Sequence, residues 1–247
     1  MTDYVNRTYR LLHNQKDLVF FRVVIKETDL DIGIPRKILS HALIESVKKE
    51  IIAIRSQIED YISENELFLT TLKPYSVSKH APELVRIMAE ASTAAGIGPM
   101  SAVAGAIAQH IGVFLSRRSS EVIVENGGDI YLRSGRIRKI GVFAGPSPFT
   151  NKLAIEIEPY LTPLGICTSS GTVGHSLSFG CADAVVILAP SAALADAVAT
   201  ATGNLVQNED DLQTAVEFAM SIKSVTGAMA IKNDKLAAAG SIQLAPF

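Results

Sequence analysis

The stretch "DAVVILAPSAALADAVATATGN", residues 183–204, contains an apolar strand, a turn and an Ala-rich helix in immediate succession. The run of Val, Ile and Leu near its start is short and apolar throughout, which is typical of a buried strand. Pro190 and Ser191 lead into a predicted helix over residues 192–202, and Gly203 is expected to cap its end. A helix that is apolar on nearly every side is predicted to be buried on nearly every side.

Asp196 interrupts this apolar helix, and Thr200 follows one turn later. A buried carboxylate without a partner is costly because its charge loses hydration. Residues at i and i+4 share a helix face, with Cβ atoms about 5–6 Å apart, so the carboxylate and the hydroxyl can bind one Mg²⁺ together. The alternative is that Thr200 bonds the carbonyl oxygen of Asp196 while Asp196 caps a neighbouring loop. The spacing alone favours this second interpretation.

The segments on both sides of this unit predict an α/β domain of the mixed α+β kind. The N-terminal part is expected to form a hairpin from residues 5–12 and 17–27, a turn with two acids, Asp29 and Asp31, and an amphipathic helix over 36–64. Acids in a turn are usually solvated, and the sequence leaves open whether these two reach a site. Further helices are predicted over 82–95, 99–115 and 209–220. Strands are predicted within 121–133, 137–144, 152–158 and 164–170, and near 223–231 and 235–243.

The composition indicates a globular, cytoplasmic protein. Hydrophobic residues make up 48% and charged residues 19% of the 247 residues, and the net charge of −2 comes without a basic tract that would suggest a nucleic-acid partner. The start of the chain lacks the pattern of a signal peptide, and its apolar runs are broken before the ~18 residues that a membrane span needs. Two cysteines without CxxC spacing indicate reduced thiols. One domain over 1–247 is expected, with an internal boundary, if there is one, in the connector 73–82.

Two polar loops are candidates for ligand binding. In "ENGGDI", residues 125–130, the two glycines let the backbone bend sharply or approach a ligand, although such a pair is more often a hairpin turn. "CTSSGTVGHS", residues 167–176, offers hydroxyl and backbone N–H donors to a phosphate or a flavin ring. Ser169 or Ser170 near His175 would suggest a nucleophile and its base, but the G-x-S-x-G elbow of serine hydrolases is absent.

The segment "GIGPMSAVAGAIA", residues 96–108, begins a helix whose N-terminus is able to bind an anion. It lacks the G-K-[ST] ending of a P-loop, and no strand leads into it as in a Rossmann fold. On its own the segment favours an ordinary helix–helix turn. Its Ala and Gly residues permit other backbones to approach the helix closely.

In order along the chain, these segments resemble the ApbE family, the flavin transferases that move FMN from FAD onto a protein threonine. "VILAPSAALADAVATAT" is similar to the family's strand-loop-helix ending in A-D-A-x-A-T, "VENGGDI" to N-x-G-G-[ND]-[IV], and "GICTSSGTVGHS" to S-x-A-T-S-G. "MSAVAGAIA" more loosely resembles the G-G-[IA]-A-K-G-Y-A helix. The resemblance covers roughly residues 95–205 and implies an ApbE-like fold with packed Ala- and Gly-rich helices on a mixed β-sheet.

The resemblance also implies a Mg²⁺ site and a flavin nucleotide, FAD or FMN, as ligand or substrate. The implied metal ligands are Asp196, Thr200 and the carbonyl of Ala102, and the metal would neutralise charge on the FAD pyrophosphate as it is cut. The implied catalytic residues are His175 and Asp196. The nucleotide is expected to lie against Asn126, Gly127, Gly128, Asp129, Thr168, Ser169, Ser170 and Gly171.

Three departures from the family's pattern leave the function open. The D-P-x-T-G part of the segment H-x-x-D-P-x-T-G and the Lys of the A-K-G-Y helix are missing, and the first 80 residues do not look like the family. A compact, diverged branch is therefore expected. Three functions are open: an enzyme that transfers FMN to an acceptor protein or hydrolyses FAD, a nucleotide-binding protein without turnover, and a structural homo-oligomer with a relic site.

Overall fold

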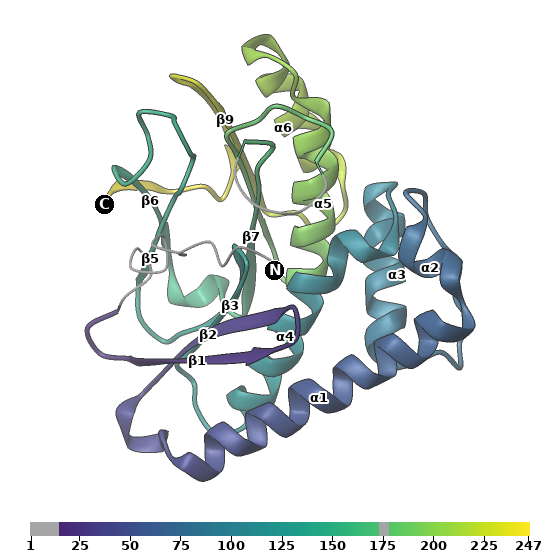
Figure 1. The fold of residues 1–247 in the computed structure, drawn as a ribbon. Coiled ribbons are helices and arrows are strands. Elements are labelled where there is room, and N and C mark those ends of the chain that lie inside the picture. Colours follow the sequence, from purple (N-terminus) through teal and green to yellow (C-terminus); the bar gives the residue numbers. More distant parts are fainter. Residues whose placement is uncertain (1–14, 173–177) are drawn as a thin grey trace.

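The computed structural model describes residues 15–172 and 178–247, which form two β-sheets and a layer of helices (Figure 1). The larger sheet has eight strands in the order β1-β2-β3-β4-β7-β8-β9-β10, and the smaller has three in the order β11-β6-β5. The expected mixed α/β class is confirmed. The sheet itself differs from the mixed one expected, because every pairing among the described strands is antiparallel.

The elements have the following bounds. The strands are β1 (Val19–Ile25), β2 (Thr28–Ile34), β3 (Val122–Asn126), β4 (Asp129–Arg133), β5 (Arg138–Gly141), β6 (Leu153–Ile157), β7 (Leu164–Ser169), β8 (Ala184–Ala189), β9 (Gly227–Lys232), β10 (Lys235–Gly240) and β11 (Leu244–Pro246). The helices are α1 (His41–Glu64), α2 (Glu66–Thr70), α3 (Glu83–Ala95), α4 (Val103–Ser116), α5 (Ala192–Leu205) and α6 (Leu212–Ser221). Short 3-10 turns are η2 (Arg36–Ile38), η3 (Pro99–Ala102), η4 (Pro159–Leu161) and η5 (Glu209–Asp211).

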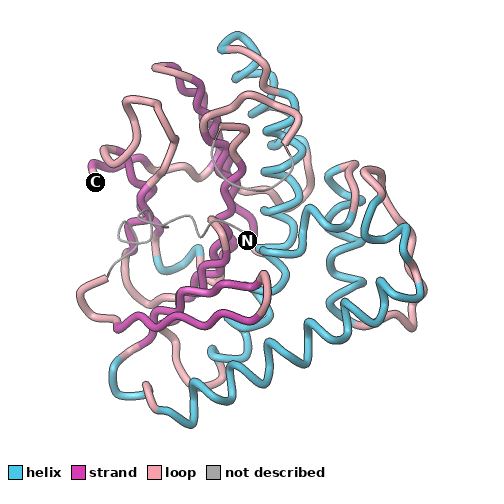
Figure 2. The backbone as a smooth tube through the Cα atoms, viewed as in Figure 1, coloured by secondary structure: helices cyan, strands magenta, loops and turns pink. Residues whose placement is uncertain are grey.

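Apolar side chains on the two faces of the larger sheet form two separate cores. Because side chains alternate along a strand, Val185 and Ile187 of β8 lie in the core under the helices, whereas Val186 and Leu188 lie in the core shared with the smaller sheet. Figure 2 shows the helices on one side of the strands and the three-stranded sheet on the other. Burial on both faces explains why β8 is a continuous apolar run in the sequence.

The N-terminal hairpin pairs β1, which confirms the strand expected within 17–27, with a strand that was not expected. β2 pairs with β1 along its whole length and also with β3, so residues 28–34 are a strand and not a turn. Leu30 and Ile32 are fully buried under the helices, and this burial outweighs the turn preference of the Asp and Gly beside them. Asp29 is buried and accepts two hydrogen bonds from Arg22 at 2.7 Å, so it is not solvated as acids in a turn usually are. The other predicted strand, 5–12, lies outside the described residues.

The predicted helices are confirmed, with differences at their ends. α1 begins after Ser40, whose Oγ accepts the N–H of Leu43 at 3.2 Å, and not at Pro35. Gly96 ends α3 with a φ of 75°, as its position predicts. Gly203 lies inside α5, because that helix runs on to Leu205, so its expected role as the cap is wrong. The short helix α2 was not predicted.

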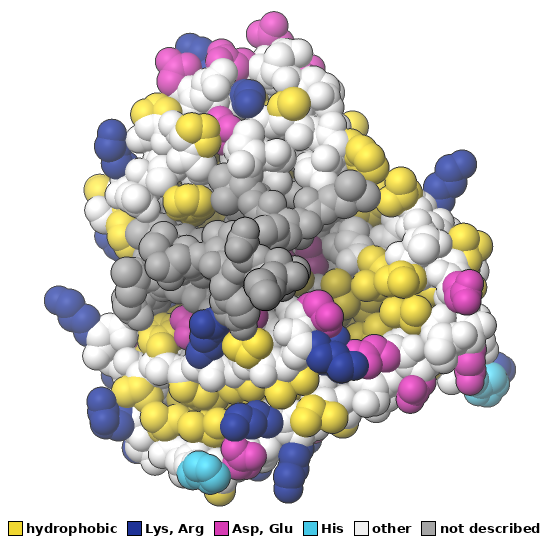
Figure 3. Space-filling view, in the orientation of Figure 1, with side chains coloured by type: hydrophobic (Ala, Val, Ile, Leu, Met, Phe, Trp, Pro, Cys, Tyr) yellow, Lys and Arg dark blue, Asp and Glu magenta, His cyan; other side chains and the backbone are white. Residues whose placement is uncertain are grey.

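The helices α1, α2 and α3 extend beyond the sheet and carry an exposed apolar surface. Leu67 of α2 and Leu72 just after it are 60% and 57% exposed. Figure 3 shows hydrophobic side chains gathered near the place where these three helices meet.

One apolar core contains residues from both sides of the connector 73–82, such as Ile51 and Met88. The internal boundary and the homo-oligomer stay predictions.

One segment of the described chain is long and apolar enough to cross a membrane. It spans Pro99–Ser116, with a mean hydropathy of 1.2, and half of it is buried inside the domain. Ala106, Ile111 and Leu115 of this segment lie in the core under the helices. Apolar helices that pack in a core have the same composition, so the segment is weak evidence for a membrane span.

A buried arginine links β5 to the start of the described chain. Arg138 is 3% exposed, and its Nη1 and Nη2 donate to the carboxylate of Asp17 at 2.6 and 2.9 Å. Nη2 also donates to Glu121 at 2.6 Å, and Nε donates to Ser134 Oγ at 2.9 Å. Two carboxylates and a hydroxyl therefore compensate for the lost hydration of this guanidinium.

We expect the free energy of unfolding to fall in acid because of this cluster. Burial opposes ionisation of Glu121, but hydrogen bonds from Ser134 and Arg138 hold its pKa below the ordinary 4.5, and the bond from Arg138 lowers the pKa of Asp17. A carboxyl whose pKa is lower in the folded protein than in the unfolded chain stabilises the fold at pH values above its pKa in the unfolded chain. This stabilisation is lost as the pH falls through the pKa of the group in the folded protein.

Urea unfolding between about pH 7 and about pH 3 checks this expectation. Glu121→Gln, which cannot ionise, should show a shallower loss of stability than the wild type over that range. Equal losses in the two proteins would contradict it.

Candidate functional site

The β3–β4 hairpin presents the polar residues of the "ENGGDI" segment at one end of the sheet. Asn126 and Asp129 pair across the strands, so Gly127 and Gly128 form the two-residue turn between them. The φ angles of these glycines are 70° and 109°, a region that glycine adopts without strain. Glu125 Oε1 accepts the N–H of Gly128 at 2.8 Å and fixes the turn. The hairpin interpretation of this segment is therefore confirmed.

Asp129 lies next to Cys167 of β7, on the face of the sheet that the helices cover. The two residues are partners in the strand register, and they are 6% and 0% exposed. The Cys167 thiol donates to the carbonyl oxygen of Ala192 at 3.2 Å, and the Asp129 carboxyl also hydrogen-bonds to Cys167 and to the N–H of Thr168. Asp129 Oδ1 is buried and has no hydrogen-bond partner within the described residues. This carboxyl therefore keeps an acceptor available.

Asp196 reaches the same place from α5. It is 8% exposed, its Oδ2 accepts the N–H of Gly105 at 2.8 Å, and the N–H of Ala104 also bonds to its carboxyl. These N–H groups belong to the first turn of α4, where no helical carbonyl is available to accept them. Asn126 Nδ2 donates to the Ala104 carbonyl at 3.1 Å. The hairpin, α4 and α5 therefore meet at the start of α4, and Asp196 does bind a neighbouring backbone.

The helices α4 and α5 cross at a glycine and cap each other. A methyl group on Gly105 would overlap the carbonyl oxygen of Ala192 and would lie 2.8 Å from the Cβ of Asp196. Gly165 of β7 likewise has no room for a methyl group against Ala192. Asp196 of α5 caps the start of α4, and Gln109 of α4 caps the start of α5, because its Oε1 accepts the N–H of Ala192 at 2.7 Å. The close backbone approach predicted for the Ala- and Gly-rich helix is confirmed.

Burial raises the pKa of both carboxyl groups. For Asp196, burial outweighs the backbone hydrogen bonds and raises the pKa from the ordinary 3.8 to about 7. The pKa of Asp129 is well above its ordinary value, first because of burial and then because of the nearby charge of Asp196. No Lys, Arg or His of the described chain forms an ion pair with either carboxyl. Burial thus favours the protonated, neutral form of both carboxyl groups, and a bound cation would favour their ionised form.

The donors around this point are oxygens, which Mg²⁺ prefers. Thr200 is half-buried one turn along α5, and Ala102 is buried in η3, directly before α4. No hydrogen bond joins the Thr200 hydroxyl to the Asp196 carbonyl in the described chain, so that part of the alternative interpretation is wrong. Within residues 15–172 and 178–247, no group of three or more His, Cys, Asp or Glu side chains could hold a metal. A Mg²⁺ at this point would therefore need further oxygen ligands, such as a hydroxyl, a backbone carbonyl or the phosphates of a nucleotide.

Residues 168–172, called here the serine-rich loop, lie beside α5. Thr168 and Ser169 end β7, and a methyl group on Gly203 of α5 would lie 3.4 Å from Ser169 Oγ. Ser170 Oγ accepts the N–H of Thr172 at 3.2 Å. His175, the predicted catalytic histidine, lies outside the described residues. The structure thus brings the other predicted segments together, and the roles of their residues stay predictions.

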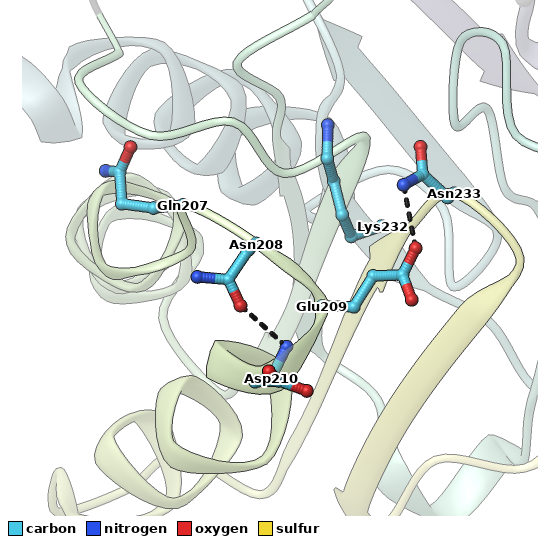
Figure 4. A pocket seen from close by; sticks show the side chains of 6 residues that line it. All are labelled: Gln207, Asn208, Glu209, Asp210, Lys232 and Asn233. Atoms are coloured by element: carbon cyan, nitrogen blue, oxygen red, sulfur yellow. Dashed lines mark hydrogen bonds between the residues drawn. The ribbon is translucent and has the colours of Figure 1, made fainter.

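A polar pocket of about 490 Å³ lies beyond the C-terminal end of α5, and sequence reasoning did not predict it. Figure 4 shows the six side chains that line it, among them Glu209, which accepts a hydrogen bond from Asn233 at 2.8 Å. Asp183, which is 1% exposed, accepts the N–H of Asn233 at 2.6 Å and the hydroxyl of Thr172 at 3.2 Å. The pocket is therefore connected to the serine-rich loop. Its lining residues are Gln207, Asn208, Glu209, Asp210, Lys232 and Asn233.

Cys167, Gly105 and Gln109 are also parts of the site, and the sequence did not predict them. Cys167 meets Asp129 only through the register of β4 and β7, which the spacing along the chain does not reveal. Gly105 lies in the segment that resembles the family's Gly- and Ala-rich helix. That glycine was therefore a visible signal for the place where Asp196 approaches.

Comparisons with known proteins identify the family and the fold of this chain. Residues 10–234 match the family model described as AbpE bacteria. A UPF0280 protein of Methanococcus vannielii is 42% identical over 211 residues, which cover 83% of this chain and 84% of that protein. A UPF0280 protein of Methanocella arvoryzae is 42% identical over 193 residues, which cover 78% of each.

Solved structures of flavin transferases have the same fold. The flavin transferase ApbE from Vibrio cholerae has a TM-score of 0.59 at 13% identity, over 91% of this chain and 97% of that one. The apo form of the Pseudomonas stutzeri flavinyl transferase ApbE has a TM-score of 0.58 at 12% identity, over 91% and 94%. These likenesses confirm the ApbE-like fold. Because the family model spans most of its residues, this chain belongs to the family described as AbpE bacteria.

Proposed function

We propose that this chain is an enzyme that cuts the pyrophosphate of a flavin dinucleotide such as FAD at a Mg²⁺ site, and passes FMN to an acceptor protein or to water. The observation that supports this most is the pair of buried carboxyls, Asp129 and Asp196, beside the first turn of α4. Two such acids without a cationic partner among the described residues ionise only at a cost unless a cation joins them. Both cysteines are free, which suits a reaction in the cytoplasm.

In this proposal, Asp196, Thr200 and the carbonyl of Ala102 hold the Mg²⁺, and Asp129 lies beside them. When bound, Mg²⁺ supplies Lewis-acid stabilisation of the charge that develops on the phosphate oxygens. The tight contacts at Gly105 and Gly165 exclude water from the back of the site, which strengthens every charge interaction there.

The nucleotide is held by the hairpin and the serine-rich loop. The turn at Gly127 and Gly128 carries no side chains, so a ligand can approach its backbone closely. Thr168, Ser169 and Ser170 are each partly exposed, and their hydroxyls can donate to phosphate or ring atoms. These contacts position the pyrophosphate next to the carboxyl groups.

FAD together with Mg²⁺ is expected to raise the melting temperature of the protein. At a ligand concentration of 100 times Kd, binding adds about 2.7 kcal/mol to the stability, which corresponds to about 5 °C or more for a chain of this size. Thermal unfolding followed by circular dichroism measures the shift, and FAD with EDTA is the control. The absence of any shift over a wide range of FAD concentrations would count against the proposal.

A nucleotide-binding protein without turnover is the second candidate. It is favoured by the narrow base of the serine-rich loop, where a methyl group on Gly171 would overlap the carbonyl oxygen of Gly180. The D-P-x-T-G segment, which the family has in this part of the chain, is missing from the sequence. Mass spectrometry after long incubation with FAD separates the two candidates, because AMP appears only if the pyrophosphate is cut.

A further inference from the structure

Phe179 is an exposed aromatic residue on a fixed backbone. It is 57% exposed, yet its N–H donates to Asn204 Oδ1 at 2.9 Å and its carbonyl oxygen accepts from Gln207 Nε2 at 3.0 Å. Both backbone polar groups are therefore held by side chains at the C-terminal end of α5. An apolar ring that is kept in water on a fixed support is available to a ligand at a low cost in entropy.

The segment that carries Phe179 lies against the predicted nucleotide loop. Methyl groups on Gly171 and Gly180 would overlap the carbonyl oxygens of Gly180 and Gly203 respectively, so these three backbones are in contact. Gly203 in turn packs beside Ser169. Phe179, the residue before Gly180, is thus directly next to the loop that offers hydroxyl donors.

Gly203, which Gly180 contacts, lies on the same helix as Asp196. Gly203 follows Asp196 by seven residues on α5, which is about two helical turns, so the two share one face and are separated by about 10 Å along the axis. This face of α5 becomes more exposed toward the C-terminal end of the helix, because Asp196 is buried whereas Thr200 and Asn204 are partly exposed. The end of α5 is therefore about 10 Å along the helix from the carboxyl group where the phosphates of a nucleotide are proposed to lie.

We propose that Phe179 stacks on the heteroaromatic ring of the nucleotide whose pyrophosphate lies at Asp196. The inference rests on the proposed function and specifies the recognised group as a flat, nitrogen-containing ring, either the isoalloxazine or the adenine of the dinucleotide. The polar pocket begins at Gln207, the residue that holds the Phe179 carbonyl, and its amide side chains suit the hydrogen-bonding edge of such a ring (Figure 4).

Titration calorimetry with Mg²⁺ present throughout tests the stacking role. Phe179→Ala is expected to bind FAD about 10-fold more weakly, in line with the loss of one ring stack. Phe179→Tyr should keep wild-type affinity, because it retains the ring. Leu205 is 45% exposed and lies on the face of α5 opposite to Asp196, so Leu205→Ala should leave FAD binding unchanged.

Inorganic pyrophosphate, ADP and FMN are the other three probes. Phe179→Ala should bind pyrophosphate as the wild type does, because this probe has no ring. If Phe179→Ala loses affinity for FMN but not for ADP, the ring that stacks on Phe179 is the isoalloxazine. If it loses affinity for ADP but not for FMN, the ring is the adenine. Unchanged FAD binding by Phe179→Ala overturns the stacking role while leaving the proposed function intact. Failure of the wild type to bind either FAD or pyrophosphate overturns the proposed function, and the stacking role with it.

Discussion

Asp196→Asn is expected to abolish Mg²⁺-dependent binding of FAD while leaving the protein folded, and more stable than the wild type above neutral pH. The amide oxygen of Asn can still accept the N–H of Gly105, so the cap on α4 survives. The charge that attracts Mg²⁺ is removed. Loss of one partner of a buried charge interaction costs at least about 2 kcal/mol, which corresponds to at least about 30-fold weaker binding.

The gain in stability follows from the raised pKa of Asp196, about 7 against an ordinary 3.8. Between these values the folded protein binds more protons than the unfolded chain, so stability without Mg²⁺ falls as the pH rises from about 4 to about 7, and then levels off. The difference corresponds to at most about 4 kcal/mol. Asn carries no such cost, and the variant should lack this part of the pH dependence.

Two measurements check this prediction. Titration calorimetry with FAD and Mg²⁺ reports the binding, and urea unfolding in EDTA at about pH 5 and about pH 8 reports the stability. Asp60→Asn makes the same chemical change on the exposed surface of α1 and should alter neither. Retained binding, or a less stable variant at about pH 8, would show that Asp196 is a structural cap and not a metal ligand.

Much of the fold was predictable because its signals are local. The apolar run of β8 and the small residues of α5 identified a strand and a buried helix, and Gly96 identified the end of α3. β2 was mistaken for a turn because its Asp and Gly residues favour turns. Its strand character comes from pairing with β1 and β3, and the partner β3 begins almost 90 residues later in the chain. Local preference could not reveal a pairing that is set by tertiary burial.

The candidate site was predictable in its parts but not in its assembly. The spacing of Asp196 and Thr200 pointed to a shared face, and the glycine pair pointed to a hairpin turn. The meeting of Asp129, Cys167 and Asp196 depends on strand register and on a helix crossing. The spare oxygen of Asp129 was likewise invisible, because it depends on which donors the neighbouring elements leave unused.

Gly105→Ala is expected to destabilise the protein by about 2 kcal/mol and to abolish the binding of FAD with Mg²⁺. Alanine is favoured over glycine inside a helix by about 1 kcal/mol, so propensity alone predicts a gain. The added methyl group, however, would overlap the carbonyl oxygen of Ala192 and crowd the Cβ of Asp196. Overpacking costs about 1–3 kcal/mol and more where backbone must move, so the steric effect is larger than the gain.

The loss of binding is the stronger part of this prediction, because it distinguishes a site that depends on the α4–α5 crossing from one that does not. Separating the helices moves the N–H of Gly105 away from Asp196 and shifts the carboxyl relative to Asp129. Urea unfolding and calorimetry with FAD and Mg²⁺ measure the two effects. Val113→Ala, at a position of α4 that is 46% exposed, should change the stability by no more than about 0.5 kcal/mol and leave binding intact. A more stable Gly105→Ala variant that still binds FAD would show that the crossing is not part of the site.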